Sequence, residues 1–413
     1  MRKNVVYNIT FILIIYFSFF LLSCDKNEDK KNIEITIENI ELSKTSMSLF
    51  IGESETLKAK IIPDNVNYKT ILWKSNDNSI AEVDDYGKVT AIRTGKTQIL
   101  AMSEDHSIIT MCVVNVSQKS IPISDISLSD SVIVLTQNES INITANIIPA
   151  NADNQIVTWK STNNSIAAIK DGKVNAFKRG TVLITATSDN NKSATCIVTV
   201  LGKFTDHRDG NVYLETNIGD QVWMAENLRY LPKVSNDVSY FVPCYYVYGY
   251  TGTDLITAKD NENYKTYGAL YNWAAATNNE VINDNNNKIK GICPEGWHLP
   301  SDVEWQELMT FLGEDEKAMI KLKAVGTAKD GTGLWNDTNI KATNESGFSA
   351  IPGGAFNRSR VYTGIGSTGF WWSSTPHETY TSWCHSLGFY SHSSFNWGYD
   401  MINCGFSVRC LRD

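Results

Sequence analysis

Cysteines have the widest choice of chemistry in this sequence, and there are eight of them. A thiol can carry a lipid, form a disulfide, bind a metal or act as a nucleophile, depending on its surroundings. One follows an apolar N-terminal stretch, two stand alone in similar segments, and five lie further along: Cys24, Cys112, Cys196, Cys244, Cys293, Cys384, Cys404 and Cys410. Such a cluster indicates an oxidising compartment, where disulfides stabilise loop-rich domains.

The N-terminal stretch explains Cys24. Arg2 and Lys3 precede residues 5–22, which are almost entirely apolar or aromatic, and Leu-Leu-Ser then leads into Cys24. A short positive region, an apolar core and a small residue before a cysteine are typical of a lipoprotein signal peptide over residues 1–23. We therefore expect acylation of Cys24, which would attach the protein to a membrane. The alternative is a transmembrane anchor, because the stretch is nearly long enough to span a bilayer.

Residues 24–36 are polar and lack periodicity, which predicts a flexible tether. Their early acidic residues resemble the surface-export signals of Bacteroidetes lipoproteins. This resemblance implies a protein that is lipid-anchored in the outer membrane and exposed at the cell surface. The whole chain has 413 residues and a net charge of −8, without a basic block. Its length predicts several domains, and its charge argues against a nucleic-acid partner.

Two similar modules follow the tether, at residues 37–117 and 121–201. Within each copy, short runs alternate between apolar and polar residues, as half-buried strands do. About seven short strands in roughly 80 residues are typical of an immunoglobulin-like sandwich. The repetition is carried by three motifs: Ile-Ile-Pro (61–63 and 147–149), Trp-Lys-Ser (73–75 and 159–161) and Ser-Ile-Ala (79–81 and 165–167).

These modules resemble group 2 bacterial immunoglobulin-like domains in the motifs Trp-Lys-Ser-x-x-x-Ser-Ile-Ala and Gly-Lys-Val-x-Ala. The resemblance implies spacer domains, although binding of a glycan or host protein by the modules themselves stays open. We expect Trp73 and Trp159 in the two cores. Cys112 and Cys196 lie in strands and lack a partner within their module, so we expect them to pack in the cores as small apolar residues.

From residue 204 onwards, tryptophan and tyrosine accumulate. Ser301 and Glu304 have the spacing of a helix capping box, and Gly313 supplies the end of that helix. The complete pattern predicts two strands within 209–228, a helix over 267–276, a helix from 302 to 312, and closing strands at 369–374 and 405–410.

Residues 204–413 resemble the Fibrobacter succinogenes major paralogous domain in the motifs Gly-Asp-Gln-Val-Trp-Met-Ala-Glu-Asn-Leu, Cys-Pro-Glu-Gly-Trp-His-Leu-Pro-Ser-Asp and Gly-Phe-Ser-Val-Arg-Cys. The helix start and the last strand also resemble the scaffold shared by formylglycine-generating enzymes and C-type lectins. The expected fold class is therefore multidomain, with two all-β immunoglobulin-like sandwiches followed by an α+β C-type-lectin-like domain.

The lectin-like resemblance implies a disulfide between Cys293 and Cys410, because the segments that hold them are neighbours in that fold. Cys384 and Cys404 could pair across adjacent strands, which leaves Cys244 free or in competition for a partner. Formylglycine-generating enzymes use two cysteines near the C-terminus, and the nearest pair here is Cys404 and Cys410. Cys293 is a better structural partner for Cys410 than Cys404 is. We therefore expect no enzymatic activity and no cofactor.

Two groups of residues invite comparison with metal sites. His377, His385 and His392 lie near Cys384, but their spacing matches no compact zinc motif. The Trp-Asn-Asp segment at 335–337 resembles part of the calcium site of lectins, but its partner motif is missing. We expect neither metal to be bound.

A surface of aromatic and polar side chains remains as the candidate ligand-binding face. Indole faces stack on sugar rings, and guanidinium groups hydrogen-bond to hydroxyls. The candidates are Trp371, Trp372, Trp383, Trp397, Tyr399, Arg358 and Arg360. Since Trp371 and Trp372 are adjacent in a predicted strand, at least one of them should point into the core.

The preferred hypothesis is a cell-surface lipoprotein that displays a lectin-like domain on an immunoglobulin-like stalk, for adhesion to a glycan or a surface protein. One alternative is a structural or assembly component of a surface appendage, without a ligand. Another is an enzyme related to formylglycine-generating enzymes.

Overall fold

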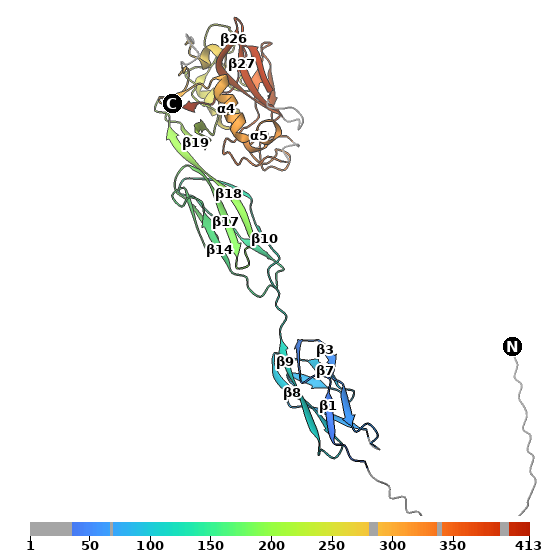
Figure 1. Cartoon of the computed structure of the whole chain (residues 1–413). Helices are drawn as coiled ribbons and strands as arrows, with labels where there is room; N and C mark the ends of the chain where they lie inside the picture. Colours follow the sequence, from blue (N-terminus) through green and yellow to red (C-terminus); the bar gives the residue numbers. More distant parts are fainter. Residues whose placement is uncertain (1–34, 67–68, 281–287, 337–340, 389–395) are drawn as a thin grey trace, which may run out of the picture. The chain divides into compact units, whose positions relative to one another are not determined.

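The computed structural model describes residues 35–66, 69–280, 288–336, 341–388 and 396–413 (Figure 1). The chain divides into two compact units, Met1–Lys119 and Ser120–Asp413. Among the described residues, none of the helices has the length and apolar character needed to cross a membrane.

The first unit holds one immunoglobulin-like module. Its strands are β1 (Asn39–Leu42), β2 (Ser46–Phe50), β3 (Ser54–Thr56), β4 (Ala59–Ile62), β5 (Ile71–Ser75), β6 (Ala81–Val83), β7 (Lys88–Ala91), β8 (Gly95–Ser103) and β9 (Ile109–Ser117). One sheet has the order β2-β9-β8-β5 and another the order β3-β7-β6. Alternate residues of both sheets bury apolar side chains between them, as expected for a sandwich.

The second unit begins with the second copy of the module. Its strands are β10 (Asp125–Leu128), β11 (Val132–Thr136), β12 (Ser140–Asn142), β13 (Ala145–Ile148), β14 (Val157–Ser161), β15 (Ala167–Lys170), β16 (Lys173–Ala176), β17 (Gly180–Ser188) and β18 (Ser193–Thr205). The parallel pair β11–β18 repeats the parallel pair β2–β9 of the first copy. The sequence repeat is therefore a repeat of topology.

The single cysteine of each module is fully buried, as predicted for Cys112 and Cys196. The two tryptophans differ from their prediction. Trp73 and Trp159 pack against the cores but are only half-buried. Each indole lies near a turn glycine, Gly87 or Gly172, and packs against the core cluster of its module from there.

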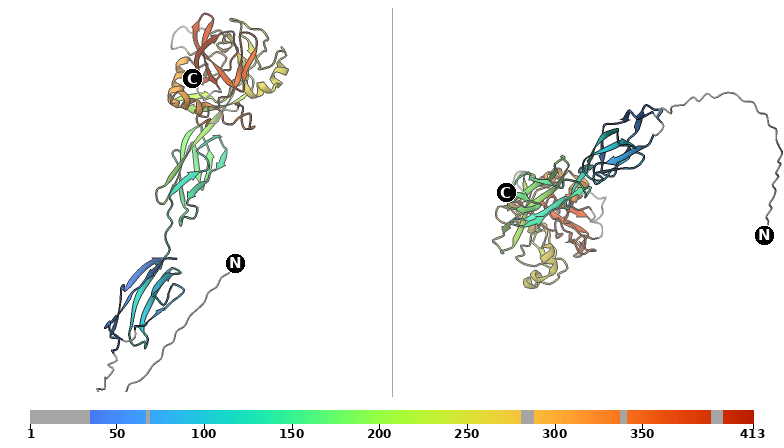
Figure 2. Two further views of the ribbon diagram at one scale, coloured as in Figure 1. Left: turned by 90° about the vertical axis from the view of Figure 1, so that its right-hand side faces the viewer. Right: turned by 90° about the horizontal axis from the view of Figure 1, so that it is seen from below.

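Strand β18 is shared between the second module and the C-terminal domain. Its first part pairs with β17, and Gly202–Thr205 pairs with β19 (Val212–Ile218). Figure 1 and the left view of Figure 2 show this strand continuing from the sandwich into the next domain. The buried carboxylate of Glu215 binds Arg179 of the module and also Arg412. Module and domain therefore share backbone pairing and a buried ion pair.

The C-terminal domain combines short helices with strands. Its further elements are β20 (Gln221–Met224), β21 (Tyr245–Tyr246), α1 (Leu255–Asp260), α2 (Glu262–Tyr267), β22 (Leu270–Tyr271), α3 (Trp273–Ala276), β23 (Trp297–His298), α4 (Asp302–Leu312), α5 (Asp315–Leu322), β24 (Gly353–Phe356), β25 (Tyr362–Ile365), β26 (Thr368–Glu378), β27 (Thr381–Gly388), β28 (Asn396–Met401) and β29 (Leu411–Arg412). Strands β19 and β20 form the predicted hairpin. Helix α4 has the predicted bounds, with the Ser301–Glu304 capping box and a left-handed Gly313.

Two segments of this domain differ from the prediction. The predicted helix over 267–276 is divided, because β22 separates the end of α2 from the one-turn helix α3. The predicted strand over 405–410 is a series of isolated bridges. Gly405, Phe406 and Ser407 each pair with a different segment, so no single neighbour is present long enough to form a ladder.

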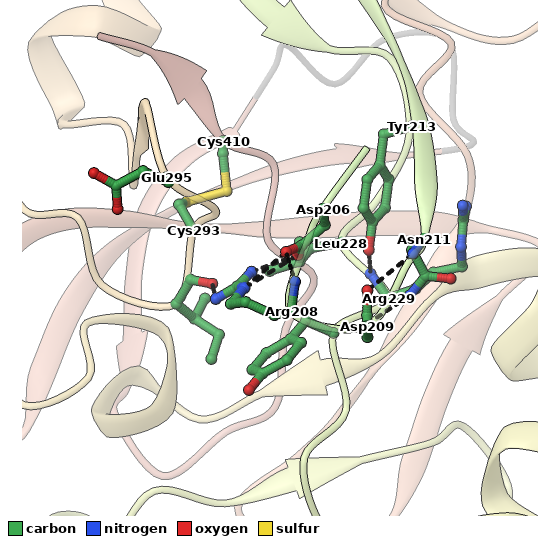
Figure 3. A network of polar contacts seen from close by, with 12 residues as sticks. Asp206, Arg208, Asp209, Asn211, Tyr213, Leu228, Arg229, Cys293, Glu295 and Cys410 are labelled. Carbon is green, nitrogen blue, oxygen red and sulfur yellow. Dashed lines mark hydrogen bonds and ion pairs between the residues drawn. A yellow bond between two sulfur atoms is a disulfide. The ribbon is translucent and has the colours of Figure 1, made fainter. Parts of the chain in front are cut away.

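The predicted bond between Cys293 and Cys410 is present, and it links residues 117 positions apart. Beside it, the guanidinium of Arg208 forms a two-point ion pair with the buried Asp206 (Figure 3). The same guanidinium donates to the backbone oxygen of Ile292, at 2.7 Å. The beginning of the domain, the loop before β23 and the last residues of the chain are thus joined at one place.

Removal of this disulfide tests its contribution to stability. The Cys293→Ala/Cys410→Ala variant should lose about 5 kcal/mol of unfolding free energy, because the open loop gains conformational entropy in the unfolded state. Urea unfolding of the C-terminal domain, followed by tryptophan fluorescence, measures this loss. Reduction of the natural chain should give the same midpoint as the variant, and an unchanged midpoint in both would contradict the prediction.

Candidate functional site

The candidate face lies on the sheet β25-β24-β26-β27-β28. Trp371 and Trp372 do not belong to it, because both are buried. Trp371 packs in one apolar cluster and Trp372 in another. The indole nitrogen of Trp371 donates to Asn227 Oδ1 at 2.9 Å, and that of Trp372 donates to the backbone oxygen of Tyr271 at 2.7 Å. The prediction of these two as ligand residues is wrong, since both faces of β26 are covered here.

Further along the β26–β27 hairpin and the adjacent strand β28, three side chains form what we call the hairpin aromatic group: His377 of β26, Trp383 of β27 and Tyr399 of β28. The rings of His377 and Tyr399 are stacked, with centroids 3.9 Å apart and planes 9° apart. Trp383 stands nearly perpendicular to both of them. Tyr399 is 57% exposed, and the other two are half-buried. The structure thus brings together two of the predicted residues, Trp383 and Tyr399, and adds His377.

A second aromatic group lies at the turn of the same hairpin, where Tyr380 meets Tyr240 and Phe241 from a distant loop. Tyr240 and Tyr380 meet edge to face, with centroids 5.3 Å apart. Phe241, Val242 and Tyr380 are all exposed. These residues are not predicted from the sequence, because a contact between two loops leaves no periodic pattern.

The remaining candidates lie elsewhere or outside the described side chains. Arg358 and Arg360 are exposed in the turn between β24 and β25, where Arg360 forms an ion pair with Asp237 at 3.4 Å. Trp397 lies in β28 opposite His385, but its side chain is outside the described part of the structure. The hairpin aromatic group is therefore the part of the predicted face that the structure carries.

The predicted Cys384–Cys404 disulfide is absent, and both residues are buried thiols. Cys384 lies in β27 opposite Gly398 and Trp372, whereas Cys404 follows β28 and directs its thiol toward Asp400 Oδ1 at 3.6 Å. Burial raises the pKa of both thiols to about 12, and the Asp400 carboxylate adds to the effect.

A reactive thiol pair for oxidase chemistry is likewise not formed. Cys410 is bonded to Cys293, and the raised pKa of Cys404 disfavours the nucleophilic thiolate. Cys244 is also a buried thiol, and its backbone exchanges hydrogen bonds with Asn272. These contacts are those of residues packed in a core.

The histidines considered for zinc lie in different surroundings. His385 is buried, stacks on Trp305 and has Nε2 3.2 Å from Asp302 Oδ1. Burial lowers the pKa of His385, although Asp302 opposes this shift. His392 lies outside the described residues, as does Asp337 of the calcium motif. In the described part of the chain, no three histidine, cysteine or acidic side chains are grouped so that they could hold a metal ion.

Family models account for most of the chain. The model of the bacterial Ig-like domain (group 2) matches residues 36–113 and 122–198. The model of the Fibrobacter succinogenes major domain matches residues 216–412. The chain therefore contains two group 2 bacterial Ig-like domains and one Fibrobacter succinogenes major domain.

Curated relatives match parts of this arrangement. An uncharacterised protein of Clostridium acetobutylicum is 29% identical over 204 residues, which are 48% of this chain and 21% of the relative. An Ig-like virion protein of Serratia phage KSP90 is 29% identical over 171 residues, which are 40% of this chain and 66% of the relative. A 3-O-alpha-D-galactosyl-alpha-L-arabinofuranosidase of Bifidobacterium longum is 41% identical over 56 residues, 14% of this chain and 5% of the enzyme. The chain thus spans less than two thirds of each of these relatives.

Solved structures resemble the chain only weakly. The match to the surface layer protein SbsC, domains 1–6, covers 46% of this chain and 31% of the SbsC chain, with 14% identity and a TM-score of 0.22. The match to mouse cadherin-23 EC22-24 covers 40% of this chain and 65% of the cadherin chain, with 13% identity and a TM-score of 0.23. Scores this low support no inference about function.

Helix α4 of the Fibrobacter succinogenes major domain is held at its start by Glu304. The carboxylate accepts from the backbone nitrogen of Ser301 at 2.8 Å and lies 2.9 Å from Nε2 of the buried His298. Burial acts to raise the pKa of Glu304, but the hydrogen bonds from His298 and Ser301 outweigh it and lower this pKa below its ordinary value. The charged form of Glu304 is therefore the one that the folded domain prefers.

Replacement of Glu304 should give a pH-dependent loss of stability. A carboxyl group whose pKa is lowered by folding stabilises the protein above its unfolded pKa, and this contribution is lost as the pH falls through the folded value. Glu304→Gln should thus cost about 1 kcal/mol near neutral pH and much less near pH 3. Urea unfolding at both values measures the difference, with the exposed Glu295→Gln as control. An equal cost at both pH values would contradict the assignment.

Proposed function

We propose that this chain is a cell-surface adhesion protein whose C-terminal domain binds a glycan through the hairpin aromatic group. The observation that carries the proposal is the arrangement of His377, Trp383 and Tyr399. Tyr399 is more than half exposed, and its ring is fixed by stacking on His377. Aromatic rings held in place near the surface stack on sugar rings at little cost in side-chain entropy.

The arrangement of polar groups around these rings supports the same proposal. His377 Nδ1 lies 3.0 Å from the hydroxyl of Thr381, which orients the imidazole. A carbohydrate hydroxyl at the edge of the stack would find the other ring nitrogen and the phenol of Tyr399 as partners. The turn group of Tyr240, Phe241 and Tyr380 offers a further exposed aromatic surface on the same hairpin.

The Ig-like domains support a surface location with an adhesive or structural role. One of the relatives described above is an Ig-like virion protein. We propose that the two modules act as spacers and that acylation of Cys24 anchors the chain to the outer membrane. We also propose a C-type-lectin-like scaffold for the C-terminal domain, supported by the bond between Cys293 and Cys410 and by the start of α4.

Glycan binding is tested by removing one exposed ring. Tyr399→Ala should weaken binding to a glycan identified on an array by about tenfold, the effect of one stacking contact. Tyr86→Ala is the matched control, because Tyr86 is 87% exposed in the first Ig-like domain. Binding constants from calorimetry decide the outcome. Absence of any glycan that distinguishes the two variants would refute the proposal.

The lipid anchor is tested at Cys24. Cells given an alkyne-labelled fatty acid should incorporate it into the natural chain and into a Cys112→Ala variant, but not into Cys24→Ser. The natural chain should also fractionate with the outer membrane, whereas the Cys24→Ser chain should not, because a single covalent modification supplies the anchor. Labelling of Cys24→Ser, or a mature chain that still begins at Met1, would exclude the anchor.

A further inference from the structure

A groove of about 590 Å³ lies between the β19–β20 turn and the outer side of α4, and its lining shares no residue with the hairpin aromatic group. We call it the α4 groove. The turn contributes Gly219, Asp220 and Gln221, and the helix contributes Val303, Glu307 and Phe311. The opposite side of α4 is the one that enters the core, through Trp305, Leu308, Met309 and Leu312. Apart from Ile218, which belongs to the same buried cluster, the residues that line the groove lie outside this core.

The apolar part of the α4 groove consists of two exposed side chains. Val303 is 60% exposed and Phe311 is 64% exposed. They are eight residues apart on one helix, which corresponds to about 12 Å along its axis. The ring of Phe311 lies over Gly219, where an added Cβ atom would come within 3.0 Å of it. The turn thus supports the ring from one side and leaves its other side to solvent.

The charge in the α4 groove is negative. Its lining includes the carboxylates of Asp220 and Glu307 and contains no lysine, arginine or histidine. Glu307 Oε2 accepts from the Gln221 amide at 3.0 Å, and the same amide donates to the backbone oxygen of Glu304 at 2.9 Å. The Gln221 oxygen in turn accepts from the indole of Trp223 at 2.9 Å. Gln221 is therefore fixed, and it holds the Glu307 carboxylate at the groove.

We propose that the α4 groove binds a partner protein through a short apolar segment that carries lysine or arginine. The apolar side chains of the segment would cover Val303 and Phe311, and its cation would lie between Asp220 and Glu307. Charge complementarity favours a cationic occupant over an acidic one. The distance between the two apolar contacts favours a peptide over a single sugar ring, because four residues of extended chain span about 13 Å.

This inference is independent of glycan binding by the hairpin aromatic group. It adds a second binding surface to the same domain, on the side formed by α4. A domain with two such surfaces could hold a glycan and a protein partner at the same time.

The test uses the full chain and a short fluorescein-labelled peptide that alternates leucine and arginine. Fluorescence anisotropy should detect binding of this peptide, and a peptide with glutamate in place of arginine should not bind. Asp220→Asn/Glu307→Gln should weaken binding about tenfold, the effect of losing two partly exposed ion pairs. Phe311→Ala should weaken it as well, through loss of the apolar contact.

Two matched variants make the result specific. Glu82→Gln/Asp85→Asn changes the net charge equally at exposed positions of the first Ig-like domain, and it should leave peptide affinity unchanged. Tyr399→Ala should also leave it unchanged, which separates this inference from the proposed glycan site. Equal binding of the two peptides, or equal affinity in the two doubly substituted chains, would overturn the inference. So would competition by a neutral oligosaccharide that depends on Phe311.

Discussion

The C-terminal domain depends on one buried cation, the guanidinium of Arg409. It is fully buried, and none of its hydrogen bonds goes to a carboxylate among the described residues. It donates to Asn227 Oδ1 at 3.0 Å, to the backbone oxygen of Ser349 at 2.8 Å and to that of Phe348. Burial lowers the pKa of Arg409 to about 9, which still leaves the group charged at neutral pH. Such a charge is tolerated only when its donors are satisfied, so these partners must stay in place.

Arg409 is also linked to one of the two buried tryptophans of β26. Asn227 accepts from Arg409 and from the indole of Trp371, so the cation and this ring are fixed together. Trp371 lies in one apolar cluster and Trp372 in the other, which places this part of β26 inside the domain. His377, Trp383 and Tyr399 lie outside these two clusters, and among these three the ring of Tyr399 is exposed. The candidate binding face is thus the part of the hairpin that the core does not need.

The features predicted well from sequence are those that depend on local patterns. The alternation of apolar and polar residues predicted the strands of the two modules, and the Ser301–Glu304 spacing predicted the start of α4. The errors arose where several segments meet. Apolar and polar residues alternate in a strand that has one solvated face, but β26 has no solvated face around Trp371. Gly405, Phe406 and Ser407 each pair with a different segment, and the Tyr240–Tyr380 contact joins two loops. Neither arrangement leaves a periodic pattern in the sequence. The Cys293–Cys410 bond was predicted from family resemblance, whereas Cys384–Cys404 rested on an assumed pairing of strands.

The shared strand β18 has a mechanical consequence. Tension applied to the C-terminal domain passes along a continuous backbone into the second Ig-like domain, without a free linker between them. The β17–β18 pairing involves eight consecutive residue pairs, from Gly180↔Val200 to Thr187↔Ser193. A pull along the strand loads these hydrogen bonds in shear, so they must break together rather than one at a time. Glu215, held by Arg179 and Arg412, connects the same two bodies through side chains. A protein exposed to flow could therefore bear load at this junction without first unfolding a hinge.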